Sequence, residues 1–370
     1  MRSRQRPRPV RALACVLALL SLCVSACAGP GGVAEAGSPG TGGARSWQEG
    51  GWRDWDPSQW VREAADFINP VIDGLWKPDR MRRGISQDQP VNGDIGEQGV
   101  SDPEPSPVFA EPVSAPYSEN APTVGKLFFD TPDGPSVCSA TVVADPANPG
   151  ASSLVWTAGH CVHSGASGGW LRNIVFVPSY NDQALANTAF RGQAGNNDNV
   201  APFGIWWADW AQTSPQWIER GGPRGGKGAP YDFAVLHVKP PSGTDATVSL
   251  EETVGGAAGI KFDAPAATGI SSMGIWGYPA ETPFDGERMF TCQGNPGRLS
   301  IRSDEPSLYR IGCTMTGGAS GGGWFVQDAN GVPVLVSNTS IGPSAKTWLA
   351  GPRFGSVAKE IYTSMSDKFA

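Results

Sequence analysis

The sequence has few histidines, few basic residues and no long apolar run, and each shortage excludes a class of function. The longest apolar stretch, Ala12–Ala26, has 15 residues, whereas a membrane-spanning helix needs about 20. Any imidazole that acts as a base or as a metal ligand must belong to one of three histidines, His160, His163 and His237. Acidic residues outnumber basic ones by 35 to 28, so the chain lacks the positive charge that is typical of nucleic-acid binding.

A group of arginines followed by a short apolar stretch forms the N-terminus. Five arginines, at positions 2, 4, 6, 8 and 11, precede Ala12–Ala26, and this order is typical of a secretory signal peptide. We therefore predict a signal peptide over residues 1–27 and an exported protein. Without residues 1–26, 23 basic residues face 35 acidic ones, a net charge near −12, and nucleic acid is still less favoured as a partner.

The end of the apolar stretch offers two processing sites. Val24-Ser25-Ala26-Cys27 is similar to the bacterial lipobox, in which the cysteine becomes lipid-modified and N-terminal. Lipidation at Cys27 accounts for the odd number of cysteines, seven, whereas ordinary cleavage after Ala28 is the alternative. The protein is thus expected to be secreted, or attached through a lipid to the extracellular face of a bacterial membrane. Residues 28–46, mostly Gly, Ala, Ser and Pro, predict a flexible Gly-rich tether.

The pattern of residues 122–370 predicts an all-β fold. Short apolar runs are separated by Gly, Pro, Asn and Asp, as expected for strands joined by turns. The runs are 137–143, 154–158, 174–177, 233–238, 272–278, 299–302, 322–326 and 332–337. A closing helix is expected from Ser356, because Val357, Ile361 and Met365 fall on one helical face.

Three short motifs supply a base, a carboxylate and a nucleophile, in that order. His160 lies in the run 157–161, Asp232 precedes the apolar run 233–238, and Ser320 lies in the glycine-rich run 316–322. A serine hydroxyl is a weak nucleophile at neutral pH, so a base such as histidine, with a pKa of about 6.5, must take its proton. A carboxylate at the edge of a buried strand needs a partner. These motifs in the order His, Asp, Ser resemble the chymotrypsin-like serine peptidases.

The resemblance covers about residues 122–368. It implies two six-stranded antiparallel barrels of the chymotrypsin type, about 122–250 and 251–370, with a C-terminal helix and a site in the cleft between them. His160 and Asp232 would come from the first barrel and Ser320 from the second. The implied function is a secreted serine endopeptidase that hydrolyses peptide bonds through a Ser-His-Asp triad and an acyl-enzyme. Main-chain N–H groups of Gly318 and Ser320 would form the oxyanion hole.

The resemblance also bears on partners. It implies a protein or peptide substrate, a monomer and no cofactor. The Gly-rich runs lack a preceding strand and a following helix with Lys or Ser/Thr in place, so a phosphate-binding loop is disfavoured.

The other two histidines suit the base less well. His163 lies toward Gly165 and Gly168, in a predicted loop. His237 lies five residues beyond Asp232 on one apolar strand, so its side chain should point to the opposite face of the sheet.

Two residues beside Ser320 depart from the commonest family pattern. Ala319 replaces the aspartate that pairs with a new N-terminus in the trypsin branch, so activation of a zymogen would need another route, such as removal of a blocking segment. Gly323 stands where proline is usual. The Gly-Gly-X-Ser form and residues 124–129 look more like the bacterial secreted branch that includes glutamyl endopeptidases.

Substrate preference is expected to be for a small or apolar residue. Glutamate-specific members use a histidine on the strand after the nucleophile, but this chain has none after His237, and the corresponding run 334–339 offers only neutral polar groups. Thr314, six residues before Ser320, is expected at the pocket floor in place of an acid, which disfavours basic substrates.

The cysteines predict disulfides rather than a metal site. The resemblance implies a bridge from Cys161 to the preceding strand, at Cys138, and Cys292 and Cys313 form the second pair. No two of these four have C-x-x-C spacing, so a metal is disfavoured. Two bridges fit an oxidising compartment.

Residues 47–121 are interpreted as a propeptide with a Pro-rich linker. A helix is expected after Asp56, with Pro57 at its first position and an apolar face at 60, 64 and 67. Residues 76–81 look like a motif in pro-regions of actinobacterial secreted peptidases. Prolines at 103, 105, 107, 112, 116 and 122 predict the linker. A disordered stalk is the alternative.

Three alternatives remain for function. A catalytically silent chymotrypsin-like fold could work as a surface binding module, since fold does not fix function. A lipase or esterase is a weaker alternative, because its catalytic residues would follow one another along the chain in the order Ser, Asp, His, which is reversed here. The Trp-rich stretch 203–217 could line a substrate groove or polysaccharide-binding face, but core packing beside an inserted loop is favoured.

Overall fold

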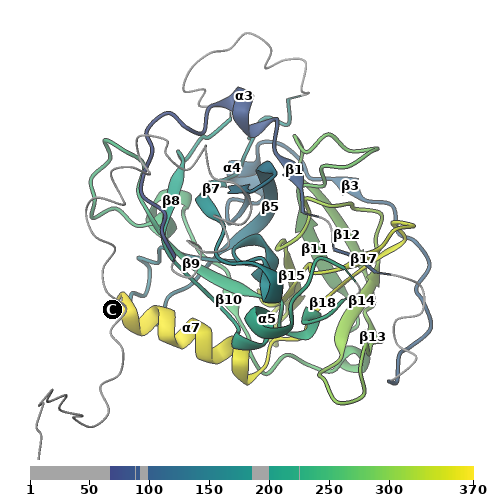
Figure 1. Ribbon diagram of the computed structural model, residues 1–370. Coiled ribbons are helices and arrows are strands. Elements are labelled where there is room, and N and C mark those ends of the chain that lie inside the picture. The colour runs from purple at the N-terminus through teal and green to yellow at the C-terminus, as the bar shows by residue number, and fades with distance from the viewer. Residues whose placement is uncertain (1–66, 88, 92–98, 186–199, 225) are drawn as a thin grey trace, which may run out of the picture. The chain divides into compact units, whose positions relative to one another are not determined.

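The computed structural model describes residues 67–87, 89–91, 99–185, 200–224 and 226–370 (Figure 1). The predicted signal peptide, Cys27, the tether 28–46 and most of the helix expected from Pro57 lie outside these residues. Within the described residues the chain is built mainly from strands, with a few short helices and one longer helix at the C-terminus.

Six antiparallel strands close the first barrel. Each strand pairs with the next, and the last, β6, pairs back to β5, so the sheet has no free edge among these six. The order around the barrel is β5 (Gly134–Val143), β4 (Val124–Thr131), β7 (Arg172–Pro178), β8 (Trp206–Thr213), β9 (Ala234–Lys239) and β6 (Leu154–Thr157). This confirms the predicted six-stranded antiparallel barrel.

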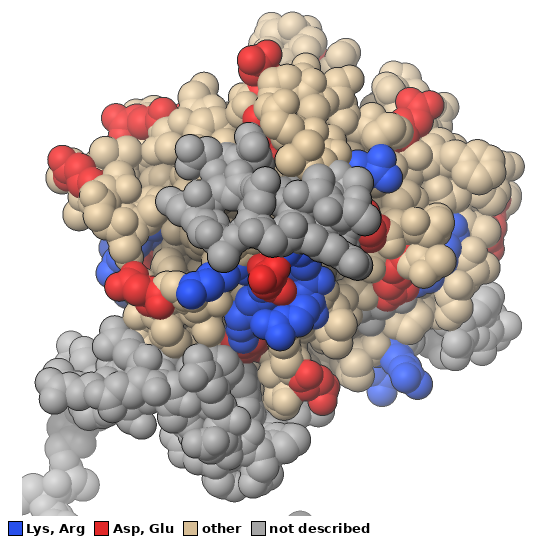
Figure 2. All heavy atoms as spheres, turned by 90° about the horizontal axis from the view of Figure 1, so that it is seen from above, with Lys and Arg blue, Asp and Glu red and all other residues tan. Residues whose placement is uncertain are grey.

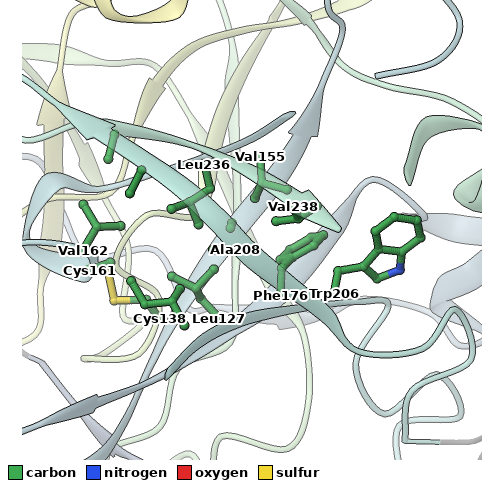
Figure 3. Close-up of a cluster of buried hydrophobic side chains, with 14 of the residues drawn as sticks. Leu127, Cys138, Val155, Cys161, Val162, Phe176, Trp206, Ala208, Leu236 and Val238 are labelled. Atoms are coloured by element: carbon green, nitrogen blue, oxygen red, sulfur yellow. A yellow bond between two sulfur atoms is a disulfide. The ribbon is translucent and has the colours of Figure 1, made fainter. Parts of the chain in front are cut away.

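Apolar side chains from all six strands fill the barrel interior (Figure 3). Leu127, Phe176 and Leu236 meet there with the Cys138–Cys161 disulfide, and the indole of Trp206 closes one side. Strands that are buried on both faces favour the near-continuous apolar runs seen in the sequence.

The second barrel is assembled from two sheets. One contains β16 (Pro333–Asn338), β15 (Gly323–Gln327), β11 (Met273–Gly277) and β12 (Phe290–Gly294), and the other contains β13 (Gly297–Leu299), β14 (Leu308–Gly312) and β18 (Trp348–Pro352). The chain passes directly from β12 to β13. Hydrogen bonds from Phe354 N–H to Val336 O and from Ser340 N–H to Ala350 O join the β16 and β18 regions.

Most strands predicted for residues 122–370 are confirmed, and one is wrong beyond its first residue. The run 299–302 was expected to be a strand, but β13 ends at Leu299 and a turn follows. The closing helix is confirmed as α7 (Ser356–Lys368), which buries Ile361 and Met365. The shorter helices are α3 (Pro78–Met81), α4 (Tyr117–Asn120), α5 (Pro215–Arg220), α6 (Leu250–Val254), η2 (Gly159–Cys161), η3 (Gly165–Ser167), η5 (Ala229–Tyr231) and η6 (Ala267–Gly269).

The Trp-rich stretch belongs to the first barrel. Trp206 and Trp207 lie in β8 and are buried, and Trp217 in α5 is buried against the turn that carries His160. The ring of Trp210 is half-buried under Lys368, whose Nζ lies 4.1 Å from the ring centroid. The core-packing interpretation is therefore confirmed, although the stretch forms a barrel strand rather than packing beside a loop.

Residues 67–121 lie against the barrels where they are described. The amide Nδ2 of Asn69 donates to Ile174 O and Ala208 O, and Trp76 Nε1 donates to Asn173 O. Further along, β3 (Glu111–Pro112) pairs with β12. Four short strands complete the fold: β1 (Ile85–Ser86) pairs with β5, β2 (Pro90–Val91) with β17 (Gly342–Pro343), and β10 (Gly259–Ile260) with β16.

A buried polar cluster links β4 to the loop before β12. Lys126 is buried, and its Nζ donates to Gly286 O at 2.7 Å. Tyr180 donates to Glu287 Oε2 at 2.9 Å. Burial lowers the pKa of Lys126 to about 8, against the opposing effect of Glu287 and Asp285. These contacts fix one barrel against the other.

Basic side chains gather around α3. Lys77, Arg80, Arg82 and Arg83 lie in and next to this helix, which faces the viewer in Figure 2, where blue side chains collect near the middle of the face. Arg80 pairs with Asp130 and Arg82 with Asp79. Acidic side chains are scattered around the group, so its charge is partly balanced.

Both predicted disulfides are present, Cys138–Cys161 and Cys292–Cys313. Stable disulfides form in oxidising compartments, which agrees with an exported protein. In the part of the chain that the structure describes, no helix has the length and apolar character needed to cross a bilayer.

We predict that replacing Cys292 and Cys313 together by alanine lowers the free energy of unfolding by about 3 kcal/mol, because the bridge restricts the unfolded chain. The two cysteines are 21 residues apart. Urea unfolding of the oxidised wild type and the double variant measures the difference. Equal midpoints and slopes would contradict this prediction.

Candidate functional site

The turn that follows β6 carries His160. Residues 159–161 form η2, and Cys161 is bonded to Cys138 on β5, so the turn is tied to the neighbouring strand. A Cβ on Gly159 would lie 2.9 Å from the indole of Trp217, so only glycine allows this close packing. His160 is 4 % exposed as a result.

Asp232 is fully buried beside His160. Its Oδ2 lies 2.7 Å from His160 Nδ1, and its Oδ1 accepts from His160 N–H at 2.8 Å. Ser340 Oγ donates to Asp232 Oδ2 at 2.6 Å. A buried carboxylate is costly without such partners, and three hydrogen bonds supply them. The imidazole is thus held through Nδ1, and its Nε2 is buried with no hydrogen bond to any described residue.

Ser320 lies in a tight glycine loop between β14 and β15. Gly318 and Gly321 have φ of +97° and +79°, which glycine adopts without strain. A Cβ on Gly321 would lie 2.1 Å from Thr157 Oγ1 and 2.9 Å from Ala158 N. The serine loop of the second barrel therefore packs directly against the residues that precede His160.

Ser139 on β5 joins the serine loop to the first barrel. Its N–H donates to Ser320 O at 2.7 Å and its Oγ donates to Gly318 O at 2.9 Å. The same Oγ accepts from Tyr278 N–H, and Ser139 O accepts from Thr157 Oγ1. Nothing in the sequence around Ser139 distinguishes it from other strand serines, so sequence reasoning missed it.

Two main-chain donors of the loop are uncommitted. Within the described residues, neither Gly318 N–H nor Ser320 N–H donates a hydrogen bond, whereas Ala319 N–H donates to Thr316 O and Gly321 N–H to Thr339 O. Uncommitted N–H groups in a rigid loop can stabilise developing negative charge on an oxygen.

A narrow pocket opens beside Ser320. Its lining includes Met315, Thr316, Ile341, Trp348 and Leu349, with Lys346 as the charged member. Lys346 pairs with Glu281 at 2.8 Å. Two expectations for this pocket are corrected. Thr314 does not line it, because its Oγ1 accepts from Ala110 N–H instead. Of the run 334–339 only Thr339 lines it, and the wall continues through Ser340 to Pro343.

The other two histidines lie outside this constellation. His237 Nδ1 lies 2.5 Å from Asp209 Oδ1, and its ring stacks on Phe369 at 3.7 Å. His163 is buried, and its Nδ1 accepts from Gly165 N–H at 3.0 Å. Among the described residues, Cys138, Cys161 and His160 form one close group of metal-ligand types, but both sulfur atoms are in the disulfide.

Solved structures share this arrangement of strands. The thermostable serine protease AL20 from an extremophilic microorganism is 31% identical to this chain, with a TM-score of 0.53, and the match covers 67% of this chain and 98% of that one. The chain belongs to the chymotrypsin-like serine proteases. Protease Anisep from Arthrobacter nicotinovorans is 27% identical, with a TM-score of 0.51 and coverage of 69% and 99%. No protein-family model matches this serine protease, and no curated protein does.

We predict that Ser139→Ala in this serine protease slows labelling by a fluorophosphonate about 10-fold. The carbonyl of Gly318 in the serine loop and the N–H of Tyr278, directly after β11, would each lose a hydrogen-bond partner. Leaving such a buried group unpaired costs about 1–3 kcal/mol. Ser152→Ala is the matched control. Ser152 is equally buried and its Oγ also makes two hydrogen bonds, to Val143 O and from Leu154 N–H, away from Ser320. Equal labelling of both variants would show that Ser139 has no positioning role.

We predict that His163 makes the fold less stable in acid. Burial lowers the pKa of His163 to about 4, below the value of about 6.5 in the unfolded chain. Between these values the unfolded state binds a proton that the folded state does not, so the free energy of unfolding falls as the pH drops from 6.5 toward 4. His163→Asn keeps an acceptor for Gly165 N–H and removes this contribution. Urea unfolding at about pH 7 and about pH 5 should show a smaller decline in the variant. An identical decline would assign the effect to other groups.

Proposed function

We propose that this chain is a secreted serine endopeptidase that hydrolyses peptide bonds through Ser320, His160 and Asp232. The observation that carries the proposal is the buried Asp232–His160 contact at 2.7 Å beside the glycine loop of Ser320. Asp232 holds the proton on Nδ1, which leaves Nε2 as the ring nitrogen that can act as a base. The serine protease relatives support the same assignment.

In the proposed reaction, His160 Nε2 takes the proton of Ser320 Oγ as that oxygen attacks the substrate carbonyl carbon. The uncommitted N–H groups of Gly318 and Ser320 bind the oxyanion. The imidazolium then gives its proton to the leaving amine, and an acyl-enzyme remains on Ser320. Water, deprotonated by the same nitrogen, attacks the acyl group and regenerates the serine.

The pocket lining supports a preference for a small or apolar substrate residue. Methionine, isoleucine, leucine and tryptophan side chains face the space beside Ser320, together with two threonines. No carboxylate is among the lining residues, and Lys346 would repel a substrate lysine or arginine. Export through the signal peptide, with a lipid on Cys27 as the further proposal, agrees with the two disulfides.

We predict that Ser320→Ala and His160→Ala each reduce peptide hydrolysis to nearly the same residual level, by about 10⁴-fold or more, because the three residues act as a unit. Protein purified from culture medium is assayed with a peptide library and a fluorophosphonate probe. His237→Ala serves as the control, since its imidazole pairs with Asp209 instead. Hydrolysis retained in Ser320→Ala would contradict the assignment, and no hydrolysis by folded wild type, also after proteolytic removal of the residues before 122, would favour the binding-module alternative.

A further inference from the structure

A short stretch of the N-terminal region is anchored at two points near the pocket beside Ser320. It comprises residues 84–87 and 89–91, which we call the covering segment. At one end β1 pairs with β5 of the first barrel, with Ser86 opposite Val137. At the other end β2 pairs with β17, with Pro90 opposite Gly342. Figure 1 shows β1 beside β5. Because Gly342 lines the pocket beside Ser320, the two anchor points flank that pocket.

The first anchor lies over the serine loop. Ser86 Oγ donates to Glu281 Oε1 at 2.5 Å, and the other carboxylate oxygen of Glu281 accepts from Lys346 at 2.8 Å. A Cβ on Gly317 would lie 2.7 Å from Ser86 Oγ, so the segment touches the backbone three residues before Ser320. Gln87 Nε2 adds a hydrogen bond to Ser136 Oγ on β5 at 3.0 Å.

The second anchor is apolar. Val91 is 2 % exposed and packs in one cluster with Ile341 and Trp348, both of which line the pocket. Gln89, just before β2, is also buried. The segment thus combines a polar contact at one side of the pocket with an apolar contact at the other.

The side chains of the proposed nucleophile and base are nearly closed to solvent in this arrangement. Ser320 is 5 % exposed and His160 Nε2 is buried, whereas a substrate carbonyl must reach Ser320 Oγ. The hydrogen-bonding edge of β17, a natural docking edge for an extended peptide, is already used by β2. A substrate backbone and the covering segment therefore compete for the same edge.

We propose that the covering segment occupies the edge of β17 and the Gly317 backbone, where an extended peptide substrate would bind, and so acts as an inhibitor of the same chain. The inference rests on the proposed serine peptidase function. It gives the protein a route to activation that needs no acidic residue at position 319: the segment must leave. Ala319 cannot make the ion pair that the trypsin branch uses.

The contacts of the segment suit a removable inhibitor. Each anchor is a ladder of two residues, which is marginal by itself. Burial acts to raise the pKa of Glu281, but hydrogen bonds from Lys346 and Ser86 outweigh it and hold the pKa below its ordinary value. Because Lys346 stays paired with Glu281 after the segment leaves, the carboxylate of Glu281 keeps a partner.

We predict that Val91→Asp in the full exported chain raises the rate of fluorophosphonate labelling at Ser320 at least 10-fold, because a buried carboxylate without a partner displaces β2. Val100→Asp is the matched control, since Val100 is 69 % exposed. Ser86→Leu is a second variant that acts at the other anchor, where Gly317 leaves no space for a larger side chain. Amide hydrogen exchange in residues 84–91 reports independently whether the segment is displaced.

Raised exchange together with faster labelling in Val91→Asp or Ser86→Leu is the expected result. Raised exchange with unchanged, readily measured labelling would overturn the inhibition and leave the serine chemistry intact. Unprotected amides in this stretch of the wild type would also overturn it, because the segment would then not be docked. Raised exchange in the variants, with no labelling of either the variants or the wild type, would contradict the proposed serine peptidase function. The proposed inhibition would then be rejected as well.

Discussion

The site depends on the hydrogen bonds that the buried carboxylate of Asp232 accepts. Asp232 has no access to water, and its oxygens accept from the backbone of His160, the imidazole of His160 and the hydroxyl of Ser340. Its own carbonyl accepts from Asn338 Nδ2 at 3.0 Å. These partners come from both barrels, so the carboxylate fixes the imidazole and also the position of the strand end that lines the pocket. Removing any partner would leave a buried charge under-solvated, which is more costly than the loss of an ordinary hydrogen bond.

A second set of contacts places Ser320, the proposed nucleophile. Ser139 holds the carbonyls of Gly318 and Ser320, and Gly321 packs against Thr157 and Ala158 without space for a side chain. The loop geometry is therefore determined by the first barrel as much as by its own glycines. This rigidity matters because oxyanion donors contribute to catalysis only when they are already aimed before charge develops.

The N-terminal region connects the fold to the proposed regulation. The described parts of residues 67–121 contact both barrels through Asn69, Trp76 and β3, and the covering segment is anchored on β5 and on β17. The proposed inhibition needs only that these local contacts be weaker than the barrels they rest on. The first barrel is a closed sheet and each barrel contains a disulfide, whereas the covering segment is held by two short ladders, two side-chain hydrogen bonds and one buried valine.

Local sequence determined most of the strands, the closing helix, the disulfide cysteines and the residues of the proposed site, because apolar runs, turn residues and the short motifs around His160, Asp232 and Ser320 are local signals. Tertiary structure alone decided which neutral residues surround them. Ser139 and Ser340 acquire their roles only through hydrogen bonds to Gly318 and Asp232, which the folded barrels bring close. Thr314 lies outside the pocket, and its Oγ1 accepts from the N–H of Ala110, 204 positions earlier. Residues 206–213 of the Trp-rich stretch form β8, which pairs with β7 and β9 and so helps to close the first barrel. Likewise, Ser86 and Val91 carry no motif. Their place beside Ser320 arises from pairings between strands far apart in sequence, which no local pattern encodes.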